Sequence, residues 1–115
     1  MSRAGPDGSA ARRRQHAAVF AALGDETRLA LVAALSGGAA RSISQLTSTS
    51  RVTRQAITKH LRVLEGAGIV RCARSGRESR FELDPAPIAE LRAYLGRVSE
   101  QWDQALARLR ALVES

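Results

Sequence analysis

The chain has 115 residues, a formal net charge of +7 and a single cysteine. This length suits one domain. The lone Cys72 excludes a disulfide within the chain, and no apolar run is long enough to span a membrane. Residues 1–11 lack the apolar core of a signal peptide, so we expect a cytoplasmic protein with a disordered tail there and a single domain over residues 12–115.

The positive charge is concentrated in the middle third of the chain. Residues 41–80 contain nine Arg or Lys against two acidic residues, whereas the charges before and after this segment nearly balance. A surface that serves only solubility mixes its charges, so a concentrated basic face indicates a polyanionic partner. We expect nucleic acid, because binding to an anionic membrane requires bulky apolar anchors, of which this segment has few.

The chain from Arg12 to Gly38 predicts two helices. The first ends at Gly24, and Asp25 is a suitable N-cap for the second, because its carboxylate can accept the free amides of a first turn. The apolar residues that recur at helical spacing, and that we expect to face the core, are Val19, Phe20 and Leu23 in the first helix and Leu29, Val32 and Leu35 in the second.

The next segment predicts two short helices joined by a turn. Ser42, with Gln45 three positions later, forms the pattern of a capping box for a helix through about Ser48. Thr53 caps a second helix that runs to about Glu65. Two short helices joined by a turn of about four residues form a helix-turn-helix unit.

After this unit the pattern changes to two strands, residues 69–74 and 80–83, with a turn over residues 75–77. A hairpin directly after a helix-turn-helix unit is typical of a wing. We therefore predict a mainly α fold with a small β-hairpin, that is, a winged helix-turn-helix fold that dimerises through its terminal helices.

A long last helix, about residues 86–113, follows the hairpin. Its apolar residues recur at alternating steps of three and four, the heptad rhythm of a helix that packs on another helix: Ile88, Leu91, Leu95, Val98, Trp102, Ala105, Leu109 and Leu112. Such a helix is longer than a domain of this size needs. This favours a dimer interface that includes the first helix over packing on its own domain alone. The predicted interface residues are Val19, Leu91, Leu95, Val98, Trp102 and Leu109.

One face of the helix after Thr53 is polar, and from Arg54 to Arg62 it carries no carboxylate. On a helical wheel Ile57, Leu61 and Leu64 form the buried stripe, and hydrogen-bond donors occupy the opposite side. Arg, Gln and Thr can bond to base edges in the major groove, and Lys and Arg also bind phosphates. A merely solvated face is the alternative, but such faces mix both signs of charge. The predicted contacts with double-stranded DNA are Thr53, Arg54, Gln55, Thr58, Lys59 and Arg62 in this helix and Arg74, Arg77 and Arg80 in the hairpin.

Three segments resemble the ArsR/SmtB-type winged-helix repressors. They are LGDETRLALVAAL at residues 23–35, ITKHLRVLEGAGIV at residues 57–70 and SGRESRFELDP at residues 75–85. They occur in the family's order, within a resemblance that covers residues 17–112. The resemblance implies a homodimer that binds a palindromic operator and usually represses transcription. It also implies that the positions closest to the bases are Arg54, Gln55, Thr58 and Lys59.

The family's metal-sensing motifs are missing from this sequence. Residues 43–48 contain no Cys, His, Asp or Glu, and the last helix contains no histidine. Two histidines and one thiol do not make a tetrahedral site within one chain. A site shared by Cys72 and His16 across a dimer stays open, although their spacing does not support it. We expect no metal and no cofactor, and the sequence does not indicate an effector ligand.

Two other classes of function remain as alternatives. An enzyme with Cys72 as its nucleophile is disfavoured, because no histidine–carboxylate pair lies near it in sequence and no Gly-rich phosphate loop is present. The other is a protein-interaction module that uses a winged helix without specific DNA readout. Salt dependence distinguishes this module from a DNA-binding repressor. The affinity of a repressor for DNA falls steeply as salt rises, because ions compete with the protein for phosphates.

Overall fold

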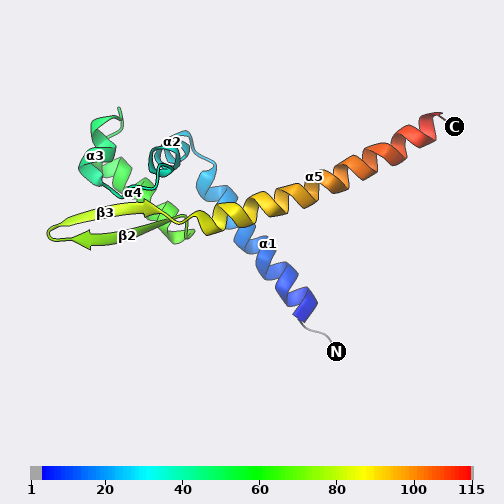
Figure 1. Ribbon diagram of the computed structural model, residues 1–115, viewed down its shortest axis with the longest axis horizontal. Helices are drawn as coiled ribbons and strands as arrows, with labels where there is room; N and C mark the ends of the chain where they lie inside the picture. Colours follow the sequence, from blue (N-terminus) through cyan, green and yellow to red (C-terminus); the bar gives the residue numbers. More distant parts are fainter. Residues whose placement is uncertain (1–3, 115) are drawn as a thin grey trace.

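The computed structural model describes residues 4–114 and shows a mainly helical chain with one small antiparallel sheet (Figure 1). The helices are α1 (Ala4–Leu23), α2 (Glu26–Leu35), α3 (Ile43–Ser48), α4 (Arg54–Gly66) and α5 (Pro85–Glu114). The strands are β1 (Arg41–Ser42), β2 (Val70–Ser75) and β3 (Glu78–Leu83). The predicted winged helix-turn-helix arrangement is confirmed, because α3 and α4 form the helix-turn-helix unit and the β2–β3 hairpin follows as the wing.

The first helix begins earlier than the sequence pattern indicated. The prediction of a disordered tail over residues 1–11 is wrong for residues 4–11, which form the first turns of α1; residues 1–3 lie outside the described part of the chain. Ala10 and Ala11 favour a helix in this segment, whereas Gly5 and Gly8 disfavour one. Pro6 falls in the first turn, where its missing amide proton breaks no helical hydrogen bond.

Local hydrogen bonds explain where three of the helices begin. At α2 the Asp25 carboxylate accepts the amide of Arg28 at 3.0 Å. At α3 the capping box is complete, because Ser42 Oγ accepts the amide of Gln45 at 3.1 Å and Gln45 Oε1 accepts the amide of Ser42 at 2.8 Å. At α4 Thr53 Oγ1 accepts a first-turn amide at 3.1 Å. Each bond satisfies an amide that helical geometry leaves without a partner, so the predicted caps are confirmed.

The core lies between the helices and one face of the sheet. Two predicted core residues are in fact exposed, Phe20 at 41% and Leu29 at 52%, whereas Leu31 is 5% exposed. The buried side of α2 follows Leu31 and Leu35, one helical turn apart, so Leu29 lies on the opposite side. The largest fully buried side chains are Val19, Leu35, Ile57, Leu61, Leu64, Ile69, Val70 and Phe81.

The sheet has the strand order β1–β3–β2 with antiparallel neighbours. β2 and β3 pair from Val70 opposite Leu83 out to a two-residue turn. Gly76 opens this turn with a φ of +67°, a conformation that glycine adopts at no steric cost. The sequence pattern did not predict β1, because two residues are too few to show alternation. Its Arg41 pairs with Phe81, so this strand depends on a contact remote in sequence.

α5 extends far beyond the rest of the molecule (Figure 1). The described chain measures 66 × 40 × 22 Å and has a radius of gyration of 18.9 Å, against about 13 Å for a compact domain of this length. The 30 residues of α5 span about 45 Å at the helical rise. Large apolar side chains are exposed along its C-terminal half, namely Trp102, Leu106, Leu109, Leu112 and Val113. None of the described helices combines the length and the apolar character needed to cross a bilayer.

Candidate nucleic-acid interface

α4 turns its apolar stripe to the core and its polar side to solvent. Ile57, Leu61 and Leu64 are completely buried, as predicted. The opposite side carries the residues predicted to contact DNA, and apart from half-buried Thr58 these are exposed: Arg54, Gln55, Lys59 and Arg62. The helix therefore offers solvent a continuous face of hydrogen-bond donors.

Hydrogen bonds within the helix-turn-helix unit orient two of these side chains. Arg54 Nη1 donates to Ser44 Oγ of α3 at 2.8 Å, and Thr58 Oγ1 donates to the Arg54 carbonyl at 2.9 Å. A guanidinium has five donors, so the bond to Ser44 fixes the direction of the Arg54 side chain and leaves donors for a ligand. The role of Ser44 was not predicted from the sequence, because Ser44 lies ten positions from Arg54. Thr53 uses its oxygen to cap α4.

Arg62 lies on the polar face and pairs with Glu65, a carboxylate at the C-terminal end of the same face. Its Nη1 is 3.2 Å from Glu65 Oε1, and the Arg62 side chain is two-thirds exposed. Surface pairs of this kind contribute little free energy in water. Arg62 can therefore exchange Glu65 for a stronger anionic partner.

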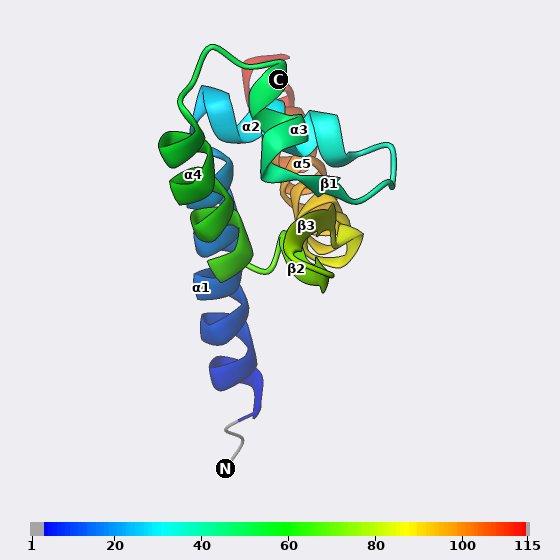
Figure 2. The same ribbon diagram turned by 90° about the vertical axis from the view of Figure 1, so that its left-hand side faces the viewer.

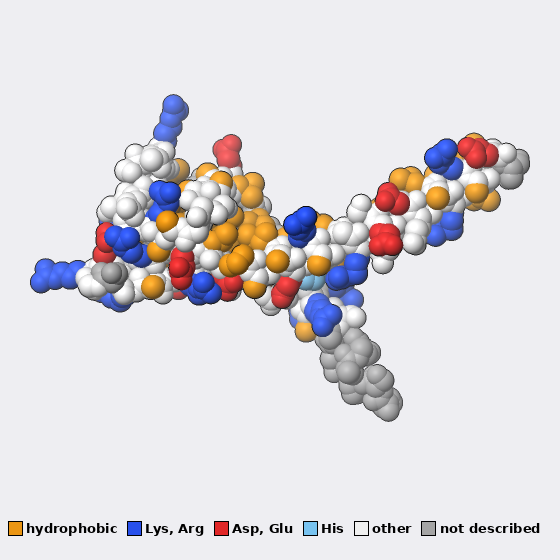
Figure 3. Space-filling view, in the orientation of Figure 1, with side chains coloured by type: hydrophobic (Ala, Val, Ile, Leu, Met, Phe, Trp, Pro, Cys, Tyr) orange, Lys and Arg blue, Asp and Glu red, His pale blue; other side chains and the backbone are white. Residues whose placement is uncertain are grey.

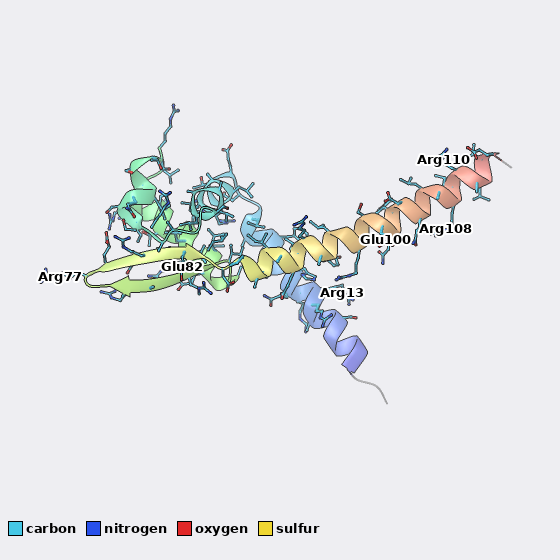
Figure 4. All side chains as sticks on the ribbon, viewed as in Figure 1. Arg13, Arg77, Glu82, Glu100, Arg108 and Arg110 are labelled. Atoms are coloured by element: carbon cyan, nitrogen blue, oxygen red, sulfur yellow. The ribbon has the colours of Figure 1, made fainter. Side chains whose placement is uncertain are left out.

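The arginines of the hairpin differ in their partners. Arg77 projects from the tip, away from the body of the molecule (Figure 4). Within the part of the chain that the structure describes, Arg77 and Arg74 make no ion pair, whereas Arg80 Nη2 lies 3.3 Å from Glu78 Oε2. Arg71, nearer the base, contacts two carboxylates at 3.5 Å. The unpaired cations of the hairpin thus lie towards its tip.

α4 and the hairpin occupy the same end of the long axis, opposite the C-terminal end of α5 (Figures 1 and 2). Lys and Arg side chains stand out from this end over α3, α4 and the hairpin tip (Figure 3). The major groove of DNA, about 12 Å wide, admits one α-helix. The arrangement can place a donor-rich helix in the groove with basic side chains beside it.

The residues predicted at a dimer interface fall into two groups. Val19 and Leu91 are 2% and 5% exposed, because they pack in the core of the single chain. Their side chains have almost no surface left for a partner, so this part of the prediction is corrected. The predicted interface residues that remain at least partly exposed, all on α5, are Leu95, Val98, Trp102 and Leu109.

Other features of the described chain are weaker candidates for a functional site. A groove of about 550 Å³ between α2 and the start of α5 has mainly apolar walls. Within residues 4–114, no three His, Cys, Asp or Glu side chains lie close enough together to hold a metal ion. Half-buried Cys72 lies opposite Phe81 in the hairpin. The ring of His16 stacks on Tyr94 with ring centres 4.5 Å apart.

Comparisons with known proteins give a consistent result. A family model described as a helix-turn-helix domain matches residues 23–73. The HTH-type transcriptional regulator Rv2034 of Mycobacterium tuberculosis is 35% identical over 94 residues, which cover 82% of this chain and 84% of that protein. Among solved structures, an ArsR-like transcriptional regulator from Rhodococcus sp. RHA1 is 37% identical, with a TM-score of 0.78 over 89% of this chain and 95% of that one. The transcriptional repressor BigR from Xylella fastidiosa is 26% identical, with a TM-score of 0.62 over 85% and 96% of the two chains.

Proposed function

Since this chain belongs to the ArsR family of winged helix-turn-helix transcriptional regulators, we propose that it is a cytoplasmic repressor that binds a palindromic DNA operator as a homodimer. The observation that carries the proposal is the exposed, donor-rich face of α4. Repression is the direction of regulation that the name of the similar BigR protein supports.

In this proposal α4 enters the major groove and reads bases. The side-chain amide of Gln55 can form two hydrogen bonds with adenine, one to N7 and one from N6. The guanidinium of Arg54 can donate two hydrogen bonds to O6 and N7 of guanine. Lys59 and Arg62 bind phosphates and set the position of the helix without reading sequence. Arg74, Arg77 and Arg80 reach phosphates or the minor groove on the flank, where arginine is favoured.

The heptad residues of α5 support a dimer with antiparallel helices. In a parallel pair Trp102 faces Trp102 of the second copy and Ala105 faces Ala105, which crowds one layer and leaves a void in the next. In an antiparallel pair Trp102 packs against Ala105, and Val98 packs against Leu109. Trp102 is 65% exposed in the single chain, so this pairing buries the largest apolar side chain of α5. We therefore propose the antiparallel arrangement.

A selection of bound duplexes from a random pool at moderate salt tests the proposal. The enriched sequences are expected to contain two inverted half-sites with centres about 34 Å apart, or a multiple of this spacing, as twofold dimers require. Affinity is expected to fall steeply as salt rises. A pool without an enriched motif contradicts the proposal. Binding of a protein partner in place of DNA, with no salt dependence, favours the interaction module.

Gln55 and Arg77 separate base reading from phosphate binding. Gln55→Ala is expected to relax the preference at one base position, at a cost of about 1–3 kcal/mol on the preferred duplex. Arg77→Ala is expected to weaken all duplexes equally and to lower the salt slope by about 1 for each hairpin bound. Repeating the selection and a salt titration with each variant measures both effects. If Arg77→Ala changed the selected motif and Gln55→Ala left it unchanged, Arg77 would be the base-reading residue and Gln55 would not.

A further inference from the structure

A polar cluster at the corner of α1, α2 and α4 takes no part in the surface described above. It consists of Asp25, Arg28 and His60, hereafter the corner cluster. Arg28 Nη1 lies 3.0 Å from His60 Nδ1, although the two residues are 32 positions apart in sequence. His60 belongs to α4, directly after Lys59 on the helix proposed to read DNA. The cluster therefore links that helix to the end of α1 and the start of α2.

Arg28 connects three helices through one guanidinium group. Its Nε donates to the Ala22 carbonyl at 2.5 Å and its Nη2 to the Ala21 carbonyl at 3.4 Å, both in the last turn of α1. The last carbonyls of a helix carry partial negative charge, which favours a cation there; the Ala21 carbonyl also accepts the amide of Gly24 at 3.2 Å. Arg28 itself lies in the first turn of α2. Its remaining contact is with His60 of α4.

This geometry determines which nitrogen of His60 carries the proton. A guanidinium only donates hydrogen bonds, so Nδ1 of His60 has to accept with its lone pair. The imidazole is then neutral, with its proton on Nε2. Protonation at Nδ1 would direct an N–H at another donor and would place two positive charges side by side. The bond between Arg28 and α4 therefore exists only while His60 is neutral.

Asp25 offers the protonated ring a different partner. Its Oδ2 lies 3.8 Å from His60 Nδ1. The amide of Arg28 holds the pKa of Asp25 below its ordinary value. Desolvation opposes this effect, whereas a protonated His60 and the charge of Arg28 reinforce it. The carboxylate therefore stays ionised when an imidazole titrates. The neighbouring last turns of α1 carry no charged side chain, so Arg28 and Asp25 are the charged groups that face His60.

We infer that Arg28 is a positioning residue for the DNA-reading helix, which it holds through neutral His60, and that protonation of His60 exchanges this bond for one to Asp25. The inference rests on the proposed function. The His60 side chain is 23% exposed and lies between the buried stripe and the polar face of α4. The apolar stripe holds α4 against the core, whereas the bond to His60 limits its rotation. Rotation of α4 changes which bases its side chains reach.

The test measures sequence discrimination, defined as the ratio of the dissociation constants for a scrambled and a selected duplex. It is measured at about pH 8 and at about pH 5.5. At fixed salt the unmodified protein is expected to lose discrimination about tenfold at the lower pH, the equivalent of one hydrogen bond to a charged group. His60→Asn retains an acceptor near the Nδ1 position and does not titrate. Its discrimination is expected to change less than about twofold with pH.

Arg28→Lys and a spectroscopic measurement complete the experiment. A lysine keeps the charge but cannot bond to α1 and α4 together, so discrimination is expected to be low at both pH values. Equal pH dependence in the unmodified protein and His60→Asn, or full discrimination in Arg28→Lys, overturns the inference. The imidazole nitrogen and carbon chemical shifts of the free protein report the tautomer, and a proton on Nδ1 at about pH 8 also overturns it. Failure of the unmodified protein to bind any duplex contradicts the proposed function, while the tautomer still decides whether the corner cluster is formed as described.

Discussion

Lys59→Glu is expected to lower operator affinity by at least about a hundredfold, because it removes a phosphate contact and places a carboxylate against the DNA backbone in both subunits. Like charges brought together in an interface cost several kcal/mol, and about 2.7 kcal/mol corresponds to a hundredfold change. Lys59 is exposed, so the fold does not depend on it. Fluorescence anisotropy with the selected duplex measures the change.

Arg110→Glu provides the matched control for Lys59→Glu. It changes the net charge by the same amount, and Arg110 lies near the far end of α5 (Figure 4). Its contact with Glu114 at 3.8 Å is a surface pair of little energetic weight. At about 0.1 M salt, charges more than about 10 Å from the DNA are largely screened, so affinity is expected to stay within about twofold. Equal losses in the two variants would mean that net charge, and not the face of α4, determines binding.

Trp102→Ala is expected to dissociate the dimer. In the antiparallel arrangement each copy buries its Trp102 in a pocket at Ala105 of the other, and a tryptophan at the centre of an interface contributes about 2 kcal/mol or more. Because symmetry removes two such contacts, the dimer dissociation constant is expected to rise by roughly a thousandfold. Sedimentation equilibrium measures it. Affinity for the palindromic operator falls with it, since a single subunit binds only a half-site.

Gln104→Ala serves as the control on the same helix, because Gln104 lies on the side of α5 opposite the heptad residues. Its effect on the dissociation constant is expected to be small. The thermal stability of monomeric Trp102→Ala is expected to match that of the unmodified monomer, since Trp102 is mostly exposed in the single chain. A Trp102→Ala variant that still forms a tight dimer would contradict the proposed seam.

Short-range signals made the starts of α2, α3 and α4 predictable from the sequence. The capping box of Ser42 and Gln45, and the caps Asp25 and Thr53, act over three positions, so their residue types alone indicate them. α4 was equally clear, because its apolar and polar residues separate onto opposite sides. In α2 apolar residues surround much of the helix. Periodicity there could not distinguish exposed Leu29 from the buried side.

Contacts between distant segments could not be read in this way. β1 exists because Arg41 pairs with Phe81, and Arg54 is oriented by Ser44. The burial of Val19 and Leu91 likewise follows from how α1 and α5 meet the core. Each of these features depends on the completed fold, whereas the donor-rich face of α4 depends only on residues within one helix. The candidate site was therefore easier to predict than the long-range contacts that hold it in place.

Removal of single acceptors from the major groove tests most directly whether α4 reads bases. In the selected duplex, 7-deazaguanine or 7-deazaadenine replaces one purine at a time, which deletes only the N7 acceptor on the major-groove edge. Affinity is expected to fall about tenfold at one or more positions of each half-site, and Gln55→Ala is expected to abolish the loss at one of them. Binding that no N7 deletion weakens, at any position, would contradict the account.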